Sequence, residues 1–333
     1  APEGSTHGWG GRIADQLAAL NGTPIFTAVS ASGNSVWLAG DQVAQYQVGS
    51  GGATRLGVDS SGRLFGSAVA GAALQRVVSN ARSSHPLDLD AADIGARSIA
   101  AELSLRTALL PPENPLFGTA PATGNYNPNN DPKLRYNNPI TGNTAYNTLA
   151  GQLQVVARMV QAAQTGATGA RRQVFFVSMG GFDTHDTQNR NHADQLAKVD
   201  QALSYFDATL GGLNARSAVT TFTASDFGRT FTSNGDGTDH GWGGHHLVMG
   251  GAVKGGDLYG SFPALATKNV ANNNFDGSPD QLGNGALLPT TSVDQLGYTL
   301  GSWFGLSAAQ LLAIFPNVAN FDASVRNLGF MNS

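Results

Sequence analysis

The chain contains no cysteine, which excludes disulfide bonds, thiolate metal ligands and a cysteine nucleophile. Charged residues are also few, at 13% of 333 residues, and the scattered lysines and arginines form no basic stripe that would bind nucleic acid. No apolar run approaches the roughly 20 residues that a membrane-spanning helix needs. We therefore expect no nucleic-acid partner and no membrane span, and any metal ion must be bound by histidine, aspartate or glutamate.

Glycine, by contrast, is abundant at 43 residues, and asparagine, threonine and serine are frequent. Low charge combined with many small polar residues is more typical of exported or surface proteins than of cytosolic ones. The composition therefore favours a periplasmic or secreted protein. A chain of this length can bury the large core of an α/β enzyme.

The pattern along the chain predicts one domain over residues 1–333, with long irregular loops. Two apolar runs, PIFTAVS and SVWLAG, predict strands near the N-terminus, whereas helical spacing dominates the part that follows. A stretch rich in proline, asparagine and glycine then has no periodicity, which predicts irregular chain over 111–143. The expected segments are a small β-rich lobe over 1–60, a helical segment over 61–110, a long loop over 111–145 and a core over 146–333.

Two short runs of β-branched and aromatic residues, 174–177 and 219–222, are typical of parallel strands covered on both faces. The residues between them have apolar side chains at three- and four-residue steps, which predicts a crossover helix. The sequence therefore predicts an α/β fold with a mainly parallel central sheet flanked by helices. In such sheets ligands bind beyond the carboxyl ends of the strands.

Candidate metal ligands follow the first of these runs. Asp183 and His185 are two residues apart, so in extended chain they point the same way and can share one cation. The alternative is that Asp183 caps the helix that follows and that His185 lies in a polar loop.

A glycine-rich loop holds a second set of candidates. Asp239 and His240 are adjacent, a geometry that suits either two neighbouring metal sites or one ligand with a partner that orients it. One of His245 and His246 is a further candidate ligand, since the two point to opposite sides of a strand.

Two charged residues in the segment ASDFGRT are candidates for catalysis. Asp226 is expected either to bind a metal ion or to orient a histidine, and the guanidinium of Arg229 suits a sulfate, phosphate or carboxylate group. The alternative is that Asp226 and Arg229 form an ion pair with each other.

Several of these motifs together resemble a known bacterial family. The segments GGFDTHD, SDFGRT, NGDGTDHGWGGHH and SVDQLGYTLGSWFGL, with IFPNVANF, resemble the Tat-exported proteins of domain-of-unknown-function family 1501, which is similar to the alkaline phosphatase and sulfatase superfamily. The resemblance covers most of the chain. It implies an alkaline-phosphatase-like fold and divalent metal ions, whether zinc, calcium, magnesium or manganese.

The resemblance also implies roles for individual residues. Asp183 and His185 match one group of superfamily ligands, Asp239 and His240 match its Asp–His pair, and His245 or His246 matches its last histidine. One departure is the spacing, because a single residue separates the first two ligands where three are usual.

Members of the family usually carry an upstream segment with a glycine-rich Asp motif and a Ser–His pair. We therefore expect an N-terminal chain of the same precursor as a partner, which supplies the nucleophile and an acidic ligand. The function implied is exported, metal-dependent hydrolysis of an anionic sulfate, phosphate or related ester. The alternative is a non-catalytic secreted binding or surface-assembly protein that retains the fold.

Overall fold

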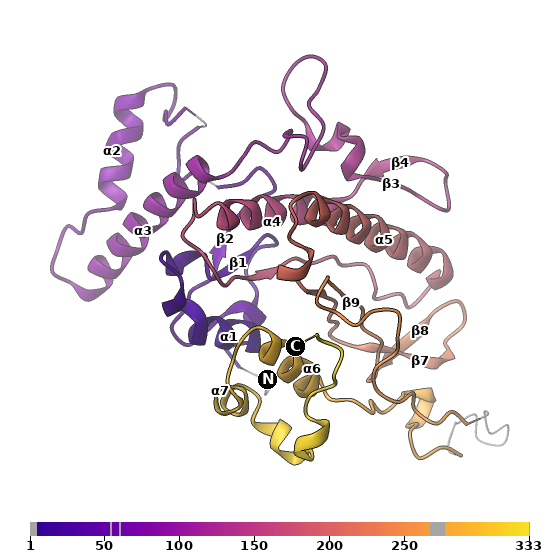
Figure 1. The fold of residues 1–333 in the computed structure, drawn as a ribbon. Helices are drawn as coiled ribbons and strands as arrows, with labels where there is room; N and C mark the ends of the chain where they lie inside the picture. Colours follow the sequence, from indigo (N-terminus) through magenta and orange to yellow (C-terminus); the bar gives the residue numbers. More distant parts are fainter. Residues whose placement is uncertain (1–4, 54, 60, 267–276, 333) are drawn as a thin grey trace. The chain divides into compact units, whose positions relative to one another are not determined.

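The computed structural model describes residues 5–53, 55–59, 61–266 and 277–332 of a mixed α/β protein (Figure 1). The chain divides into two compact units. Unit 1 contains Ala1–Phe117 and Gly151–Val177, and unit 2 contains Gly118–Ala150 and Ser178–Ser333. The expectation of a single domain stays a prediction.

A small parallel sheet lies in unit 1. Its strand order is β2-β1-β5, and Val29 of the middle strand pairs with Tyr46 on one side and Phe175 on the other. The run at 174–177, predicted to be a central parallel strand, does form the parallel strand β5, but at the edge of this sheet rather than at its centre. The elements of the unit are α1 (Trp9–Leu17), η1 (Ala18–Leu20), η2 (Pro24–Phe26), β1 (Ala28–Ser30), η3 (Val36–Leu38), β2 (Tyr46–Gln47), α2 (Ala68–Val78), α3 (Pro86–Ala108), α4 (Thr148–Gln164, whose first three residues belong to unit 2) and β5 (Val174–Phe176).

Apolar side chains cover both faces of this sheet, because successive strand residues point to opposite sides. Val29 belongs to a buried cluster with Leu105 of α3 and Met159 of α4. Its neighbour Ala28 belongs to a second cluster with Ala14 of α1. The sheet therefore lies between helices, which is why its strands read as continuous apolar runs rather than as alternating ones.

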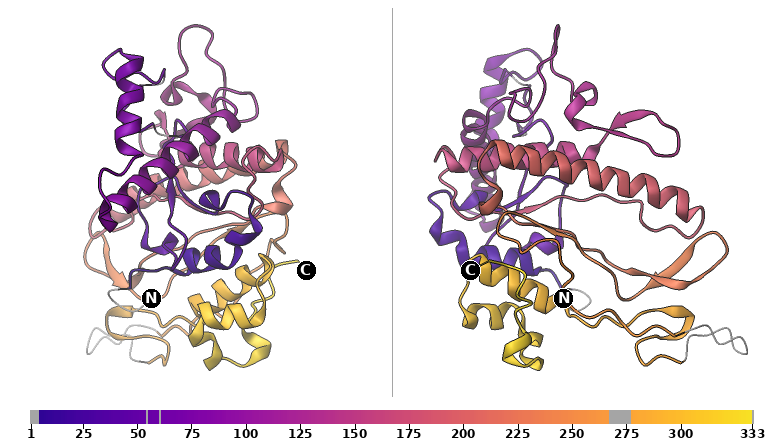
Figure 2. Two further views of the ribbon diagram at one scale, coloured as in Figure 1. Left: turned by 90° about the vertical axis from the view of Figure 1, so that its left-hand side faces the viewer. Right: turned by 45° about the vertical axis from the view of Figure 1, so that its right-hand side comes forward.

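The helical segment predicted over 61–110 is confirmed as the helices α2 and α3, which can be followed in Figure 2. The Ser67 side chain caps the first of these helices by accepting a hydrogen bond from Ala70 N. The strand predicted for SVWLAG is wrong, because this segment forms the 3-10 helix η3. The Trp37 ring there packs edge-on against Trp9 at 4.8 Å between centroids.

Unit 2 is built from short antiparallel pairs and helices. The strands pair as β3 with β4, β6 with β9, and β7 with β8. Its elements are η4 (Pro128–Asn130), η5 (Pro132–Leu134), β3 (Arg135–Asn137), β4 (Thr144–Tyr146), α5 (Gln188–Gly212), η6 (Arg216–Ala218), β6 (Thr221–Phe222), β7 (Gly228–Ser233), β8 (Thr238–Gly241), β9 (Val248–Met249), η7 (Gly283–Gly285), α6 (Val293–Trp303), α7 (Ala308–Ile314), η8 (Pro316–Asn320) and η9 (Ala323–Val325).

The predicted parallel crossover is only partly confirmed. The helix between the two runs is present as α5, but β6 pairs antiparallel with β9, so the prediction of a second parallel strand is wrong. The turn after β9 brings Gly250 close to Val219. A Cβ on Gly250 would lie 2.6 Å from the carbonyl oxygen of Val219, so this pairing requires glycine at 250. A glycine-dependent contact of this kind has no periodicity that the sequence could reveal.

The loop predicted over 111–143 is mostly irregular, as expected, but a short hairpin of β3 and β4 occupies its C-terminal end. The Asn138 side chain makes the turn of this hairpin by accepting hydrogen bonds from Ile140 N and Thr141 N, both at 2.9 Å.

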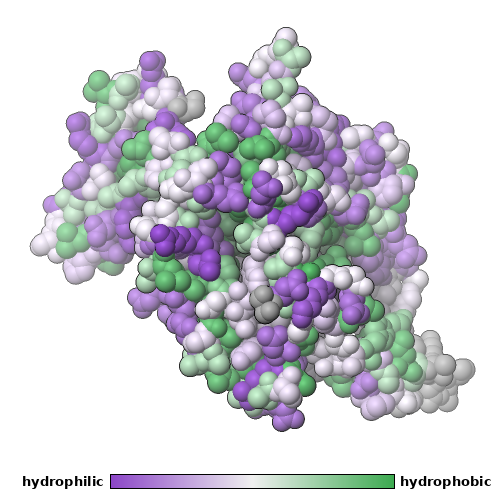
Figure 3. Space-filling model, in the orientation of Figure 1, coloured by the Kyte–Doolittle hydropathy of each residue, from purple (hydrophilic) through white to green (hydrophobic). Residues whose placement is uncertain are grey.

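In the part of the chain that the structure describes, no helix has the length and apolar character needed to cross a membrane. On the face drawn in Figure 3, hydrophobic residues are interspersed with hydrophilic ones.

Candidate metal site

The hairpin of β7 and β8 carries three of the candidate residues. Arg229 on β7 lies directly opposite His240 on β8, so these two side chains are cross-strand neighbours. Asp239 precedes His240 on the same strand. Two further candidates, Asp183 and His185, come from the irregular segment between β5 and α5.

This irregular segment is attached to the end of the hairpin by close backbone contacts. Gln188 N donates a hydrogen bond of 3.0 Å to Asp236 O. A Cβ at Gly237 would lie 2.3 Å from the backbone of His185, so only glycine permits this approach. Side chains far apart in sequence are thereby brought together.

Three side chains of this region converge on one point. The Nε2 atoms of His185 and His240 each lie 2.8 Å from Asp183 Oδ1 and are 3.2 Å from each other. Among the described residues, they form the one group of at least three histidine, aspartate or glutamate side chains placed to share a metal ion. We call Asp183, His185 and His240 the ligand cluster.

The ligand cluster is open to solvent, as its side chains are 56%, 48% and 50% exposed. Thr187 is the N-cap residue of α5, and the Asp183 carboxylate faces the histidines. The alternative role of Asp183 as a helix cap is therefore wrong.

Asp239 lies on the far side of the His185 ring. Its Oδ1 is 3.5 Å from His185 Nδ1, the nitrogen that does not face the ligand cluster. The carboxylate is held by the side-chain amides of Asn234 at 3.2 Å and Asn284 at 3.1 Å. His240 thus belongs to the cluster, whereas Asp239 faces the outer nitrogen of His185, and the metal-binding roles expected for this pair stay predictions.

The Arg229 guanidinium contacts the ligand cluster from the other side. Its Nη1 donates to Asp183 Oδ1 at 3.2 Å, its Nε donates to Thr238 Oγ1 at 2.9 Å, and its Nη2 donates to Thr184 O at 2.7 Å and to Thr238 O. The ion pair considered for Arg229 and Asp226 is therefore replaced by one with Asp183. All three guanidinium nitrogens already have protein acceptors.

Phe227, just before β7, contacts both His240 of the ligand cluster and its neighbour Arg229. Its ring stacks on that of His240 at 4.0 Å between centroids, and the Arg229 guanidinium carbon lies 5.7 Å from its centre. The stacked ring fixes the plane of the imidazole.

The contacts shift the pKa of both carboxyl groups downward. The hydrogen bond from His240, followed by that from Arg229, lowers the pKa of Asp183 below its ordinary value. Hydrogen bonds from Asn234, then from Asn284 and His185, lower the pKa of Asp239. Both groups are thus carboxylates at neutral pH, the form that orients an imidazole or binds a cation.

Besides Arg229 and Asp239, which contact the ligand cluster, two further expected site residues lie outside it. His245 stacks its ring on Phe262 at 5.3 Å, and Asp226 is exposed at the start of the segment leading to β7. Desolvation of its ring, and then the charge of His245, lower the pKa of His246. The functions predicted for Asp226 and His245 stay predictions.

Sequence reasoning missed the residues that hold the candidates in place. Asn234 lies in the same glycine-rich loop as Asp239, so proximity alone could have suggested it. Asn284 has no such signal, because it comes 45 residues after Asp239 and reaches it only through the fold. Phe227 lies within the segment ASDFGRT, where only the charged residues suggest chemistry from the sequence.

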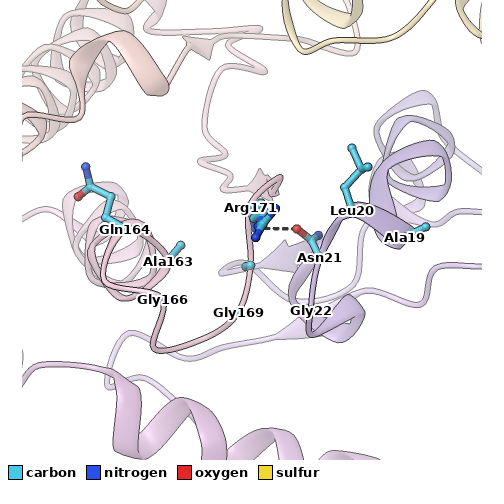
Figure 4. Close-up of a pocket in the computed structure, with 10 residues that line it drawn as sticks. Ala19, Leu20, Asn21, Gly22, Ala163, Gln164, Gly166, Gly169 and Arg171 are labelled. Carbon is cyan, nitrogen blue, oxygen red and sulfur yellow. Dashed lines mark hydrogen bonds between the residues drawn. The ribbon is translucent and has the colours of Figure 1, made fainter.

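Unit 1 has a pocket of about 570 Å³, and its chemistry differs from that of the ligand cluster. Asn21 and Arg171 line it, and the Asn21 side chain accepts the backbone N–H of Arg171 at 2.6 Å (Figure 4). This asparagine side chain joins two chain segments of unit 1. The pocket brings together no titratable group other than the exposed Arg171.

Comparison with known proteins gives one match. No curated protein and no solved structure matches the chain. A family model with the description "Protein of unknown function (DUF1501)" matches residues 129–315, more than half of the chain, and the ligand cluster lies within the matched region. The chain therefore belongs to the DUF1501 family of proteins of unknown function.

Proposed function

We propose that the ligand cluster binds a divalent metal ion and that the protein uses it to hydrolyse a sulfate, phosphate or related ester. The observation that carries the proposal is the convergence of Asp183 Oδ1 and two imidazole nitrogens at a solvent-exposed point. Three protein ligands with an open position are typical of catalytic metal sites, whereas structural sites are closed by four.

The spacing of the donor atoms supports a metal ion of zinc-like size. A tetrahedral ion with bonds of about 2.0–2.1 Å needs ligand atoms about 3.3 Å apart. The two imidazole nitrogens, at 3.2 Å, match this separation. Asp183 Oδ1, at 2.8 Å from each, needs to retreat by about half an ångström.

The donor types narrow the choice of ion. Two imidazoles with one carboxylate suit zinc, iron or manganese, whereas calcium and magnesium prefer ligand sets made of oxygen. Among the ions expected from the family resemblance, zinc and manganese therefore fit better than calcium and magnesium. The same donor set binds iron(II) in oxygenases, so metal analysis is part of the test.

The neighbouring residues would hold the cluster ready for the ion. Asp239 faces His185 Nδ1, so it favours the tautomer whose Nε2 lone pair points at the cluster. The pair of Arg229 with Asp183 keeps the ligand ionised and oriented. A bound divalent ion supplies Lewis-acid polarisation of an ester and lowers the pKa of coordinated water.

We also propose a specific role for Arg229. The anion clamp expected for this residue would require its hydrogen bonds to Thr184 and Thr238 to open first. The contacts of Arg229 instead favour a role in positioning Asp183. The positive charge of Arg229 would still lie close to an approaching anionic ester. The expected roles of Asp226, as a metal ligand or an orienter of a histidine, and of His245, as a further metal ligand, remain part of the proposal.

The proposal is tested by measuring metal affinity and ester turnover in the same samples. Calorimetric titration with zinc, manganese, calcium and magnesium is followed by assays with aryl sulfate and aryl phosphate. Asp183→Asn should abolish both metal binding and turnover. Asp186→Asn, an exposed acid in the same segment, is the matched control and should change neither. Absence of metal binding in the unmodified protein, or equal turnover in Asp183→Asn, contradicts the proposal.

The alternative is a non-catalytic secreted binding or surface-assembly protein. It is supported by the many glycine- and asparagine-rich loops, and it predicts a bound ion without turnover of any ester. The alkaline-phosphatase-like fold, Tat export and periplasmic or secreted location remain proposals. So does a partner chain from the same precursor, which native and denaturing mass spectrometry of one sample would reveal.

A further inference from the structure

Unit 2 contains a pocket of about 420 Å³ in addition to the ligand cluster. Its walls come from the β3–β4 hairpin, from α5, and from the segment Ser178, Met179 and Gly180. The volume is within the range of about 300–1,000 Å³ that small-molecule sites occupy.

The pocket is close to the ligand cluster because one chain segment forms part of both. Gly180 lines the pocket, and Asp183 follows three residues later, so their Cα atoms are at most about 11 Å apart. Between them, Gly181 has a φ of 96°, and a Cβ there would lie 2.1 Å from Gln195 Nε2 on α5. Gln195 thus lines the pocket and fixes the segment that carries the metal ligand.

A hydrogen-bonded network makes one wall rigid. Lys198 Nζ lies 2.7 Å from Asp194 Oδ2, while the Tyr136 hydroxyl and the Asn138 amide donate to Asp194 Oδ1 at 2.8 and 2.6 Å. The Lys198 ammonium also lies 5.5 Å from the centre of the Tyr136 ring. Because Asp194 compensates the charge of Lys198, this wall offers hydrogen-bonding groups without excess charge, while the Tyr136 ring behind them is buried.

The remaining walls have the same character. Tyr146 adds a second, half-buried phenol, whose desolvation raises its pKa, so it is a neutral donor at physiological pH. Thr148 and Ser178 contribute hydroxyl groups, and Gln195 contributes an amide. The half-buried ring of Tyr146, beside hydroxyl and amide groups, suits a ligand with apolar C–H faces and many hydroxyls.

We propose that this pocket is a binding subsite for a neutral, polyhydroxylated ring, such as a hexose unit. The subsite would hold the sugar while an ester group attached to it reaches the ligand cluster. The substrate class would then be a sulfated or phosphorylated carbohydrate. This last step rests on the hydrolase function proposed above, whereas binding of the sugar does not.

The subsite is tested by titrating the full chain, treated with EDTA, with the methyl glycosides of glucose, galactose and mannose. Saturation-transfer NMR should detect binding of at least one glycoside. Ser178→Trp, which fills the pocket from an exposed position, should weaken binding at least 10-fold, and Tyr146→Ala serves as a second variant if the first misfolds. Ser204→Trp, exposed on α5 outside the pocket, should change the affinity less than twofold.

Asp183→Asn should leave glycoside binding within twofold of the unmodified protein, which separates the subsite from the metal site. If turnover exists, Ser178→Trp should raise KM for a sugar sulfate at least 10-fold and leave KM for aryl sulfate unchanged. Failure of metal binding alone leaves the glycoside result standing. Absence of binding by all three glycosides overturns the subsite. So does binding in both Ser178→Trp and Tyr146→Ala that is as tight as in the unmodified protein.

Discussion

Different interactions dominate the centre of unit 1 and the surroundings of the ligand cluster in unit 2. The centre of unit 1 is a parallel sheet with buried apolar clusters on both faces, where Phe26, Val29 and Leu105 are at most 1% exposed. Around the ligand cluster of unit 2, short antiparallel strands carry half-exposed side chains that are fixed by hydrogen bonds and ion pairs. Apolar burial therefore dominates stability in one region, and polar contacts determine chemistry in the other.

The largest expected effect is a loss of stability in a variant whose metal affinity should stay unchanged. Leu105→Ala removes a fully buried side chain from the unit 1 core and should lower the free energy of unfolding by about 2–5 kcal/mol. Metal affinity of the folded protein should stay within twofold. Leu103→Ala, on the same helix but 51% exposed, is the control and should cost less than about 0.5 kcal/mol. Denaturant unfolding and zinc calorimetry measure the two quantities, and an equal cost for both leucines would break the comparison.

The second-largest effect is expected for the substitution of a polar residue in unit 2. Arg229→Lys keeps the charge but loses the forked donors that bond Asp183, Thr184 and Thr238, which should cost about 1–3 kcal/mol of stability. Metal affinity should fall as well, because Asp183 loses its partner. Arg326→Lys provides a control away from the cluster, since the Arg326 guanidinium donates to the backbone carbonyls of Phe321 and Ala319. Unchanged metal affinity in Arg229→Lys would contradict the positioning role.

Asp239→Asn tests the residue behind His185. The substitution keeps the shape but removes the charge that orients the imidazole, so metal affinity should fall by about 10–100-fold. Asp236→Asn, an exposed acid in the same turn, is the control and should have little effect. Should Asp239→Asn instead abolish binding as completely as Asp183→Asn, Asp239 would be a direct ligand.

The smallest effect concerns pH. Asn234 and Asn284 lower the pKa of Asp239, so the carboxylate stabilises the fold above the pKa of the unfolded chain. This contribution is lost as the pH falls through the lower, folded pKa. Asn284→Ala should raise the pKa of Asp239 towards its ordinary value and move this acid loss to higher pH. Carbon-13 NMR titration of the Asp239 carboxyl measures the shift, and an unchanged pKa would contradict the assigned cause.

Much of unit 1 could be predicted from the sequence alone. The run at 174–177 predicts the parallel strand β5, and apolar spacing predicts helices within 61–110; in unit 2 the same spacing predicts α5. A strand that is buried on both faces has an unbroken apolar run, and a helix that is buried on one side has apolar residues at helical spacing. Both patterns can be recognised in a single sequence.

The second strand was predicted wrongly because its partner depends on a distant turn. Nothing in residues 219–222 distinguishes a parallel neighbour from the antiparallel β9, and the close approach of Gly250 to Val219 that accompanies the pairing appears only in the folded chain. Likewise, the hydrogen bond between Asn284 and Asp239 arises only from folding.

The sequence by itself determined which residue types are available for chemistry. With no cysteine, the paired motifs of aspartate and histidine were the natural metal ligands, and Asp183, His185 and His240 do converge. Only the tertiary structure decided their separate roles. Asp239 faces the outer nitrogen of His185, and Arg229 bonds Asp183 rather than Asp226. The physical reason is that residue type and spacing fix which groups a chain can offer, whereas distances of about 3 Å between distant segments depend on backbone packing.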